Sequence, residues 1–220
     1  MARRGKFITF EGLDGCGKTT QLKKLAASLR RQGIRVVTTR EPGGTPIGEK
    51  IRSVLLDSRT AGMAPLAELA LMFGARAQHI QQVILPAVKA GQWVLCDRFT
   101  DSSEAYQGGG RQLGSATILT LHRTLCDDLQ PDLTLLLLSD PKKSVERARG
   151  RNQRNQHIAD EGRFELETTA FFHRVSRAYL ALAKREAKRI VAVESGRSIP
   201  EVQKAVWAAV EARLLKKGGR

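Results

Sequence analysis

Apolar runs and helical periodicities alternate along the chain. Five short, nearly continuous apolar runs predict β-strands at 7–10, 34–39, 93–96, 133–138 and 189–193. Between them, apolar residues recur every three or four positions, which predicts helices at 19–32, 47–56, 65–89 with a bend near Pro86, 115–126, 141–149, 165–188 and 200–215. Strands that are apolar throughout are typical of parallel sheets covered on both faces. We therefore predict an α/β fold, a three-layer α/β/α arrangement around a parallel sheet of about five strands.

The chain shows no linker and no repeat that would divide it. With 220 residues, 41% of them hydrophobic, it has enough apolar material for one sizeable core. We therefore expect a single domain over 1–220, in which the run Gly108-Gly109-Gly110 is a loop. Residues 150–162 lack apolar periodicity and are predicted to be a mobile surface segment.

Several classes of protein are disfavoured by composition. No apolar run approaches the ~18–20 residues of a membrane span, and the basic N-terminus leads into no secretory segment. Cys16, Cys96 and Cys126 form no CxxC pair, which argues against a disulfide scaffold or a zinc site and favours the reduced cytoplasm. The formal net charge of +15 favours an anionic partner, although a solvated basic surface explains it equally well.

The strongest local signal lies between the first strand and the first helix. It has the Walker A form GxxxxGK[ST], in which glycines let backbone N–H groups converge on phosphate oxygens at the start of a helix. Lys18 is placed to reach the β- and γ-phosphates of a nucleoside triphosphate, and the Thr19 hydroxyl to bind Mg²⁺. The nucleotide-binding residues predicted here are Gly12, Leu13, Asp14, Gly15, Cys16, Gly17, Lys18, Thr19 and Thr20. No Asn-Lys-x-Asp motif is present, which disfavours a switch GTPase.

Two further groups of residues suggest how an acceptor is bound. Asp97 and Arg98 directly follow the third strand, where α/β sheets bind ligands, so Asp97 is expected to hold Mg²⁺ and Arg98 an anion. An ordinary surface ion pair is the alternative. Phe73 and Arg76 are three residues apart on one predicted helix, so that a ring and a guanidinium could together bind a nucleobase. Simple core packing is the alternative for Phe73.

Beyond these motifs, the chain resembles the thymidylate kinase family, whose members transfer a phosphoryl group from ATP to dTMP. The resemblance spans nearly the whole chain in order. The matching segments are Phe10-Glu11-Gly12-Leu13-Asp14-Gly15-Cys16-Gly17-Lys18-Thr19-Thr20, Thr39-Arg40-Glu41-Pro42-Gly43-Gly44-Thr45, Leu71-Met72-Phe73-Gly74-Ala75-Arg76, Asp97-Arg98-Phe99 and Ala105-Tyr106-Gln107-Gly108-Gly109-Gly110-Arg111-Gln112. The run from Pro131-Asp132-Leu133 through Asp140-Pro141 also fits.

The resemblance implies a role for each matching residue. Asp14 would bind the sugar 3′-hydroxyl, and Arg40 and Arg98 the dTMP phosphate. Phe73 would stack on thymine with Arg76 at its O4 edge, Ser103 and Gln107 would contact the base, and Tyr106 would favour deoxyribose. The family's turn also implies a cis peptide bond between Glu41 and Pro42.

The source of the catalytic arginine distinguishes two types within the family. One type carries it in the phosphate loop, at the position of Gly15 in this chain, so the resemblance implies the bacterial type with lid arginines. The lid would span approximately 150–163. Among the candidates Arg147, Arg149, Arg151 and Arg154, we expect Arg149 and Arg151 to act with Lys18, Arg98 and Asp97 in catalysis. The sequence Asp160-Glu161-Gly162 before Arg163-Phe164-Glu165 departs from the usual family pattern.

The predicted activity is therefore a Mg²⁺-dependent transfer from ATP to dTMP by a cytoplasmic homodimer that binds neither nucleic acid nor membrane. A kinase for another nucleoside monophosphate is the first alternative. A nucleic-acid-dependent ATPase is less favoured because basic residues are dispersed and aromatic residues few. A non-catalytic nucleotide-binding protein is disfavoured because Lys18, Thr19, Asp97 and Arg98 are all present.

Overall fold

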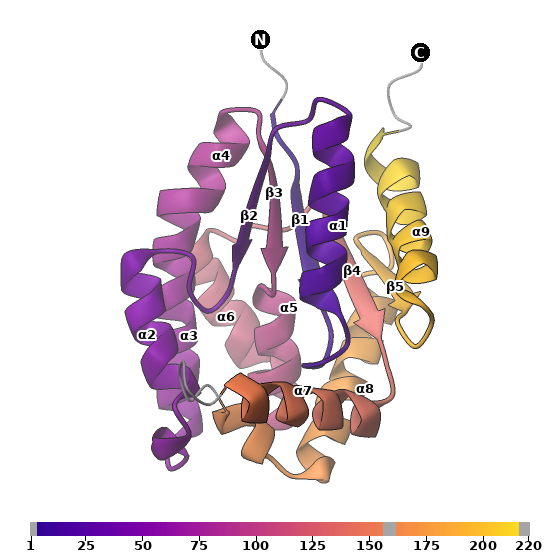
Figure 1. The fold of residues 1–220 in the computed structure, drawn as a ribbon. Coiled ribbons are helices and arrows are strands. Elements are labelled where there is room, and N and C mark those ends of the chain that lie inside the picture. The colour runs from indigo at the N-terminus through magenta and orange to yellow at the C-terminus, as the bar shows by residue number, and fades with distance from the viewer. Residues whose placement is uncertain (1–3, 156–161, 216–220) are drawn as a thin grey trace.

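The computed structural model describes residues 4–155 and 162–215, with only the backbone for residues 149 and 151–155. One parallel sheet, in the order β2-β3-β1-β4-β5, forms its centre (Figure 1). Its strands are β1 (Phe7–Glu11), β2 (Val36–Arg40), β3 (Trp93–Asp97), β4 (Leu133–Leu138) and β5 (Ile190–Glu194). The prediction of a parallel sheet of five strands is confirmed, and each strand lies where its apolar run placed it.

Helices cover both faces of the sheet, as the apolar runs predicted. One face is covered by α1 (Lys18–Arg31) and α9 (Ile199–Val210), against which Ile8 and Phe10 of β1 pack. Because successive strand residues point to opposite faces, Phe7 instead packs against the helices of the other face. Those helices are α3 (Pro65–His79), α4 (Leu85–Lys89), α6 (Ser115–Cys126) and α8 (Thr169–Arg185). The three-layer α/β/α architecture is thus confirmed.

The long helix expected at 65–89 is interrupted just before Pro86. A π-helical segment, Ile80–Ile84, separates α3 from α4. Proline has no N–H to donate within a helix, and a wider turn before it removes the need for that bond. The predicted bend is therefore a change of helix type.

The segment after β3 differs from the prediction of a loop at the three glycines. It forms α5 (Thr100–Ser103) and a π-helical segment, Glu104–Gly110. A Cβ at Gly109 would lie 2.6 Å from the Cβ of Ala178, and one at Gly110 would lie 2.5 Å from the Phe171 ring. The glycines therefore allow α8 to pack closely against this segment. Composition alone does not reveal such a packing requirement.

Two boundaries near the predicted lid also differ. The helix α7 (Pro141–Asn155) continues past 149, so the first residues of the expected lid are helical. Residues 156–161 lie outside the described part of the chain. The helix expected from 165 begins later, as α8, because the Thr168 side chain caps it by accepting a hydrogen bond from the Phe171 N–H at 3.2 Å.

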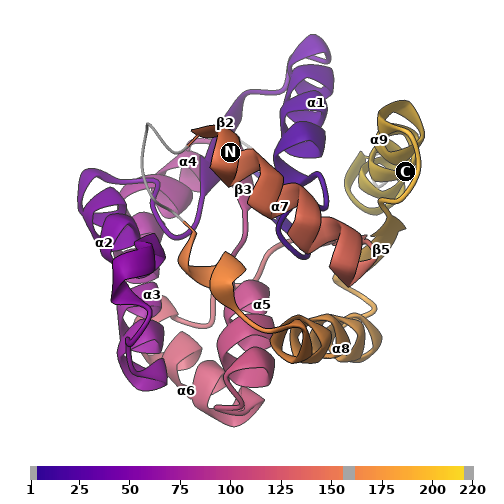
Figure 2. The ribbon, with the colours of Figure 1, turned by 60° about the horizontal axis from the view of Figure 1, so that its bottom comes forward.

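The carboxyl ends of the strands meet at one edge of the sheet, and α7 crosses this edge (Figure 2). A remaining helix, α2 (Pro46–Leu56), packs beside α3. Among the helices of residues 4–155 and 162–215, none combines the length and apolar character needed to cross a lipid bilayer.

Candidate active site

A cavity of about 1160 Å³ opens at the carboxyl edge of the sheet. This is the edge at which parallel α/β sheets bind their ligands, as predicted from the sequence. Of the predicted site residues, it is lined by Asp14, Gly15, Gly17, Lys18, Thr19, Thr20, Arg40, Arg76, Asp97, Arg98, Ser103, Tyr106 and Gln107. Gly12, Leu13 and Cys16 belong to the same loop without lining the cavity. The side chains of Arg149 and Arg151 lie outside the described part.

The phosphate loop depends on glycines with left-handed backbones. Gly12, Gly15 and Gly17 have φ angles of 131°, 78° and 100°. The ammonium of Lys18 donates to the carbonyl oxygens of Gly12 at 3.1 Å and Leu13 at 3.0 Å, and lies 3.9 Å from Asp14 Oδ1. Carbonyl oxygens carry no net charge, so the positive charge of Lys18 is held at the loop and is available to an anion.

Gly15 marks the contact between the phosphate loop and α7. A Cβ at this position would lie 2.2 Å from the Ser144 carbonyl oxygen and 3.2 Å from Arg147 Cβ. No side chain fits there, so an arginine at this position is excluded by packing. Arg147 on α7 itself lines the cavity, next to Gly15.

Thr19 and Asp97 meet at the start of α1. The Thr19 hydroxyl donates to Asp97 Oδ2 at 2.9 Å, which joins the phosphate loop to the end of β3. A hydroxyl and a carboxylate are hard oxygen donors that suit Mg²⁺. The predicted metal-binding pair is therefore brought together, and its donor atoms fit the ion.

Arg98 is held by a dense network on the acceptor side. Its backbone is left-handed, with φ 74°. Its guanidinium donates to Asp14 Oδ1 at 2.8 Å, to Ser102 at 2.9 Å and to the hydroxyls of Tyr106 and Tyr179 at 3.2 and 3.3 Å. Burial alone would lower the pKa of Arg98, but the neighbouring Asp14 carboxylate outweighs it and keeps the pKa above its ordinary value. Arg98 is thus a permanent cation at the cavity wall.

Glu11, at the end of β1, lies fully buried near Arg98. It accepts hydrogen bonds from the Phe99 N–H at 2.7 Å, the Ser102 hydroxyl at 2.5 Å and the Tyr179 hydroxyl at 3.1 Å. Burial raises the pKa of Glu11 to about 7, with the Asp101 carboxylate adding to the effect. The carboxyl group therefore fixes the turn that carries Arg98, and titrates near neutral pH.

Arg76 is buried between two rings and a carboxylate. Its Nε donates to Glu41 Oε2 at 2.7 Å, and its Nη2 donates to the Ser103 hydroxyl at 3.0 Å and the Phe99 carbonyl at 3.2 Å. Its guanidinium carbon lies 4.6 Å from the centre of the Phe73 ring. Nη1 is buried without a hydrogen-bond partner among the described residues. Because Arg76 lines the cavity, a ligand oxygen is the natural partner for that atom.

Phe73 itself does not face the cavity. Its exposed fraction is 0%, and it packs in the core with Phe7 and Leu69. The preceding residue, Met72, lines the cavity instead. Adjacent helix residues point about 100° apart, so a shift of one position exchanges a core residue for a cavity residue. The structure thus corrects the expectation that Phe73 supplies the base-facing surface.

The remaining predicted contacts lie on the helical segment after β3 or at the end of β2. The Tyr106 hydroxyl donates to Asp14 Oδ2 at 3.3 Å. Gln107 donates to Glu68 at 2.8 Å, and the same fully buried carboxylate accepts from Arg111 and, at 2.7 Å, from Arg163. Arg40 is half-exposed and pairs with Glu49 at 2.9 Å.

Sequence reasoning missed several residues that shape this site: Glu11, Glu41, Glu68, Met72 and Tyr179. Glu11 and Glu41 had one available signal, since Glu11 is an acidic residue at the end of a strand and Glu41 directly follows one. Glu68, Met72 and Tyr179 lie on helices, and only the packing of those helices brings them to the site. The expected Glu41–Pro42 cis peptide bond is present.

Known proteins resemble the chain over most of its length. A family model described as "Thymidylate kinase" matches residues 10–206. The thymidylate kinase of Geotalea uraniireducens is 47% identical over 210 residues, which cover 96% of this chain and 98% of that protein. That of Trichlorobacter lovleyi is 48% identical over 208 residues, covering 94% and 98%. A crystal structure of thymidylate kinase from Ehrlichia chaffeensis matches with a TM-score of 0.74 and 30% identity, covering 94% of this chain and 99% of that one.

Proposed function

We propose that this chain, which belongs to the thymidylate kinase family, transfers a phosphoryl group from ATP to dTMP, giving dTDP and ADP. The observation that carries the proposal is the buried guanidinium of Arg76, whose Nη1 has no partner among the described residues while the side chain lines the cavity. A buried donor without a partner is costly, and a carbonyl oxygen of a pyrimidine base satisfies it.

The acceptor nucleotide lies along the wall formed by α3 and the segment after β3. Arg76 donates to the base, and Ser103 and Gln107 line the same part of the cavity. Met72 packs against the ring in place of Phe73, with a polarisable thioether suited to such contacts. Tyr106 lies beside Asp14 at the sugar, where its buried ring leaves little room for a 2′-hydroxyl.

The phosphate of dTMP binds between Arg98 and Arg40. A phosphate monoester has a second pKa of ~6 and is largely dianionic at neutral pH, so it needs no general base. The obstacle is the repulsion between two anionic nucleotides. Arg98, fixed by Asp14 and Ser102, counters that repulsion on the acceptor side.

ATP binds over the phosphate loop. The backbone N–H groups of residues 12–19 and the start of α1 hold its phosphates, and the Lys18 ammonium moves from the Gly12 and Leu13 carbonyls to the phosphate oxygens. Thr19 and Asp97 would hold Mg²⁺, which would supply further neutralisation of phosphate charge.

Arginines of α7 and the lid complete the charge around the transferred group. Gly15 brings α7 against the loop, and Arg147 lines the cavity there. Arg149 and Arg151 follow on the same helix backbone and remain our proposed catalytic pair. The lid predicted over 150–163, of which residues 156–161 lie outside the described part, would exclude water so that ATP is not hydrolysed.

We also propose that the enzyme is a cytoplasmic homodimer that binds neither nucleic acid nor membrane. The three described cysteines are free and buried, in keeping with a reduced compartment. The homodimer rests on the family resemblance.

The test is ADP formation measured with Mg²⁺ and ATP against dTMP, dUMP, UMP and AMP. Fast turnover with dTMP and slow turnover with UMP and AMP is expected. A preference for UMP or AMP would indicate another nucleoside monophosphate kinase. ATP turnover stimulated by DNA, with none on dTMP, would replace the proposal with a nucleic-acid-dependent ATPase.

A further inference from the structure

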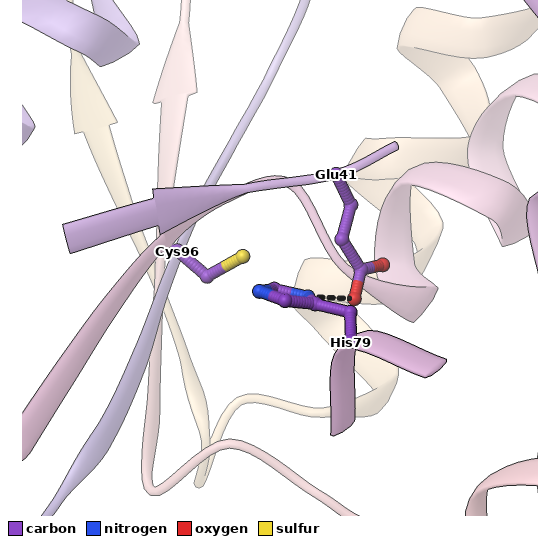
Figure 3. A group of neighbouring side chains, drawn as sticks. All are labelled: Glu41, His79 and Cys96. Carbon is purple, nitrogen blue, oxygen red and sulfur yellow. Dashed lines mark hydrogen bonds and ion pairs between the residues drawn. The ribbon is translucent and has the colours of Figure 1, made fainter. Parts of the chain in front are cut away.

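Glu41, which lines the acceptor cavity, meets His79 and Cys96, which are not among the residues that line it. Figure 3 shows the three side chains together. Glu41 directly follows β2, His79 is the last residue of α3 and Cys96 is the last but one of β3, and all three are buried. One ligand atom from each lies within 4.8 Å of the others. Carboxylate, imidazole and thiol are the groups that bind zinc in proteins, so the cluster needs an explanation.

Hydrogen bonds account for these three groups better than a metal does. His79 Nδ1 is 2.8 Å from Glu41 Oε1, and His79 Nε2 is 2.6 Å from the Thr39 hydroxyl. The Cys96 thiol donates to the Arg98 carbonyl at 3.0 Å. Burial raises the pKa of Cys96 well above its ordinary value, whereas zinc binds the thiolate. Both imidazole nitrogens and the thiol are therefore already engaged.

The direction of the hydrogen bonds follows from the charge on Glu41. Burial alone would raise the pKa of this carboxyl group, but the Arg76 guanidinium and the hydrogen bond from His79 outweigh it and hold the pKa below its ordinary value. Glu41 is thus ionised and can only accept. His79 Nδ1 must carry a proton and donate it to Oε1, and in the neutral ring Nε2 accepts from Thr39.

The two oxygens of Glu41 therefore serve different partners. Oε1 accepts from His79, and Oε2 accepts from Arg76 Nε. A carboxylate with both oxygens free prefers to grip a guanidinium through two parallel bonds. In this site, such a two-bond arrangement would join the Glu41 carboxylate to both Nε and Nη2 of Arg76. It would then compete with the hydrogen bonds that Nη2 donates to Ser103 and Phe99. The bond from His79 keeps Glu41 attached to Arg76 through one oxygen.

The turn after β2 packs tightly against His79 and holds its ring between Thr39 and Glu41. A Cβ at Gly44 would lie 2.6 Å from the Thr39 hydroxyl oxygen and 2.7 Å from His79 Nε2. The backbone thus closes over the Thr39–His79 bond. His79 itself is fully buried, three residues after Arg76 on α3.

We propose that His79 is a positioning residue for recognition of the acceptor base: by holding one oxygen of Glu41, it sets the rotation of the Arg76 guanidinium and leaves Nη1 to the base. This deepens the proposed function and rests on it for the identity of the ligand. The chain of contacts runs from Thr39 through His79 and Glu41 to Arg76.

The test compares His79→Phe with His79→Asn. Phenylalanine retains a ring and removes the donor, whereas the asparagine amide can donate from close to the position of Nδ1. A charge-assisted hydrogen bond of this kind is worth about tenfold or more in affinity. We expect His79→Phe to raise the KM for dTMP and its Kd by calorimetry ~10-fold. The kcat at saturating dTMP and the KM for ATP should change less than ~2-fold, and His79→Asn should recover most of the dTMP affinity.

Equal loss in both variants, or kcat falling together with thermal stability, would show a merely structural role and overturn the proposal. Thr39→Val guards against misfolding of His79→Phe: it removes the hydroxyl bonded to His79 Nε2 at a residue that itself lines the cavity, so the NMR resonance of the Arg76 Nε–H is measured in this variant too. It should raise the KM for dTMP a few-fold, without lowering kcat. An unchanged KM for dTMP in Thr39→Val would also overturn the proposal.

A second readout does not depend on the substrate. The Nε–H resonance of Arg76 in NMR spectra should move in His79→Phe and stay near the wild-type position in His79→Asn. An unmoved resonance overturns the proposal even if the enzyme is active. If instead wild-type protein fails to phosphorylate dTMP while the resonance behaves as expected, the proposed function fails and the positioning of Arg76 by His79 stands.

Discussion

The two halves of the cavity hold their cations in different ways. On the donor side, Lys18 is held mainly by two backbone carbonyls of its own loop, five and six residues away in sequence. On the acceptor side, Arg98 pairs with Asp14 at 2.8 Å and Arg76 with Glu41 at 2.7 Å, across 84 and 35 residues. Carbonyls leave a charge ready to move to a ligand, whereas carboxylates fix it in place. The Lys18 side chain can therefore move with the flexible phosphate chain of ATP, whereas Arg98 and Arg76 are fixed in position to recognise one rigid acceptor nucleotide.

The largest effect should come from the donor side. Lys18→Ala removes the cation that we propose meets the ATP phosphates, and we expect turnover to fall by at least ~10³-fold. The affinity for dTMP, measured by calorimetry, should change little, because the acceptor wall is untouched. Lys24→Ala, on the same helix but not lining the cavity, is the matched control. Full activity in Lys18→Ala would remove the loop from the mechanism.

The next effect concerns the lid. Replacing Arg149 and Arg151 together by alanine should lower turnover ~10³-fold, the worth of a catalytic arginine, and weaken ATP binding much less. Arg147→Ala, whose side chain lines the cavity beside Gly15, serves as the comparison. If Arg147→Ala gives the larger loss of turnover, Arg147 is the catalytic arginine. A loss confined to ATP affinity would contradict the assignment to Arg149 and Arg151.

Arg76→Lys sharpens the acceptor side of the comparison. Alanine is a poor choice here, because it would leave Glu41 buried without its cation and destabilise the fold. Lysine keeps the charge opposite Glu41 but loses the planar fork and the Nη1 donor. We expect kcat/KM for dTMP to fall ~10²-fold, with the melting temperature lowered by a few degrees because the buried bonds from Nη2 to Ser103 and Phe99 are also lost. An unchanged kcat/KM would refute the base-reading role.

Gly15→Ala tests the packing of α7 on the phosphate loop. The new Cβ would clash with the Ser144 carbonyl oxygen, so α7 must shift, and turnover should fall ~10-fold. Gly33→Ala is the matched control, because Gly33 has the same φ of 78° and nothing within 4 Å of its Cβ position. It should cost ~1 kcal/mol of stability and leave turnover unchanged. Equal loss of turnover in both variants would assign the effect to backbone strain.

The smallest effect is a pH dependence carried by Glu11. Its pKa is raised from 4.5 to about 7, so between these values the folded chain keeps a proton that the unfolded chain has lost. Unfolding then releases protons, and this contribution to stability falls as the pH rises through that range. Glu11→Gln should lack it, so the melting temperature of the variant should gain on the wild type from pH 5 to 7.5. Parallel curves would contradict the buried, protonated carboxyl group.

How much the sequence revealed also differs between the two sides. The phosphate loop is a continuous motif, so Lys18, Thr19 and the glycines could be identified from spacing alone. On the acceptor side, Arg76 was predicted from its spacing with Phe73, and Ser103 and Gln107 were identified through a family resemblance. The carboxylates that pair with Arg76 and Gln107, Glu41 and Glu68, were missed. Those pairings join segments that only the folded sheet brings together.

Helix register and close packing account for the remaining misses. Nothing in the sequence decides whether Met72 or Phe73 faces the cavity, since both are apolar and a rotation of one residue exchanges them. The glycines at 108–110 suggested a loop because glycine is common in loops. In the structure they belong to a π-helical segment, and their lack of a side chain lets α8 pack closely against it. Strand positions were predictable because burial on both faces leaves an uninterrupted apolar run.

A crystal structure with dTMP bound tests the central claim most directly, namely that buried, carboxylate-fixed arginines read the acceptor. The account predicts Arg76 Nη1 within hydrogen-bond distance of a base carbonyl, Arg98 at the phosphate, and Met72 against the ring with Phe73 still in the core. A base bound away from Arg76, or Phe73 turned out to stack on it, would contradict the account.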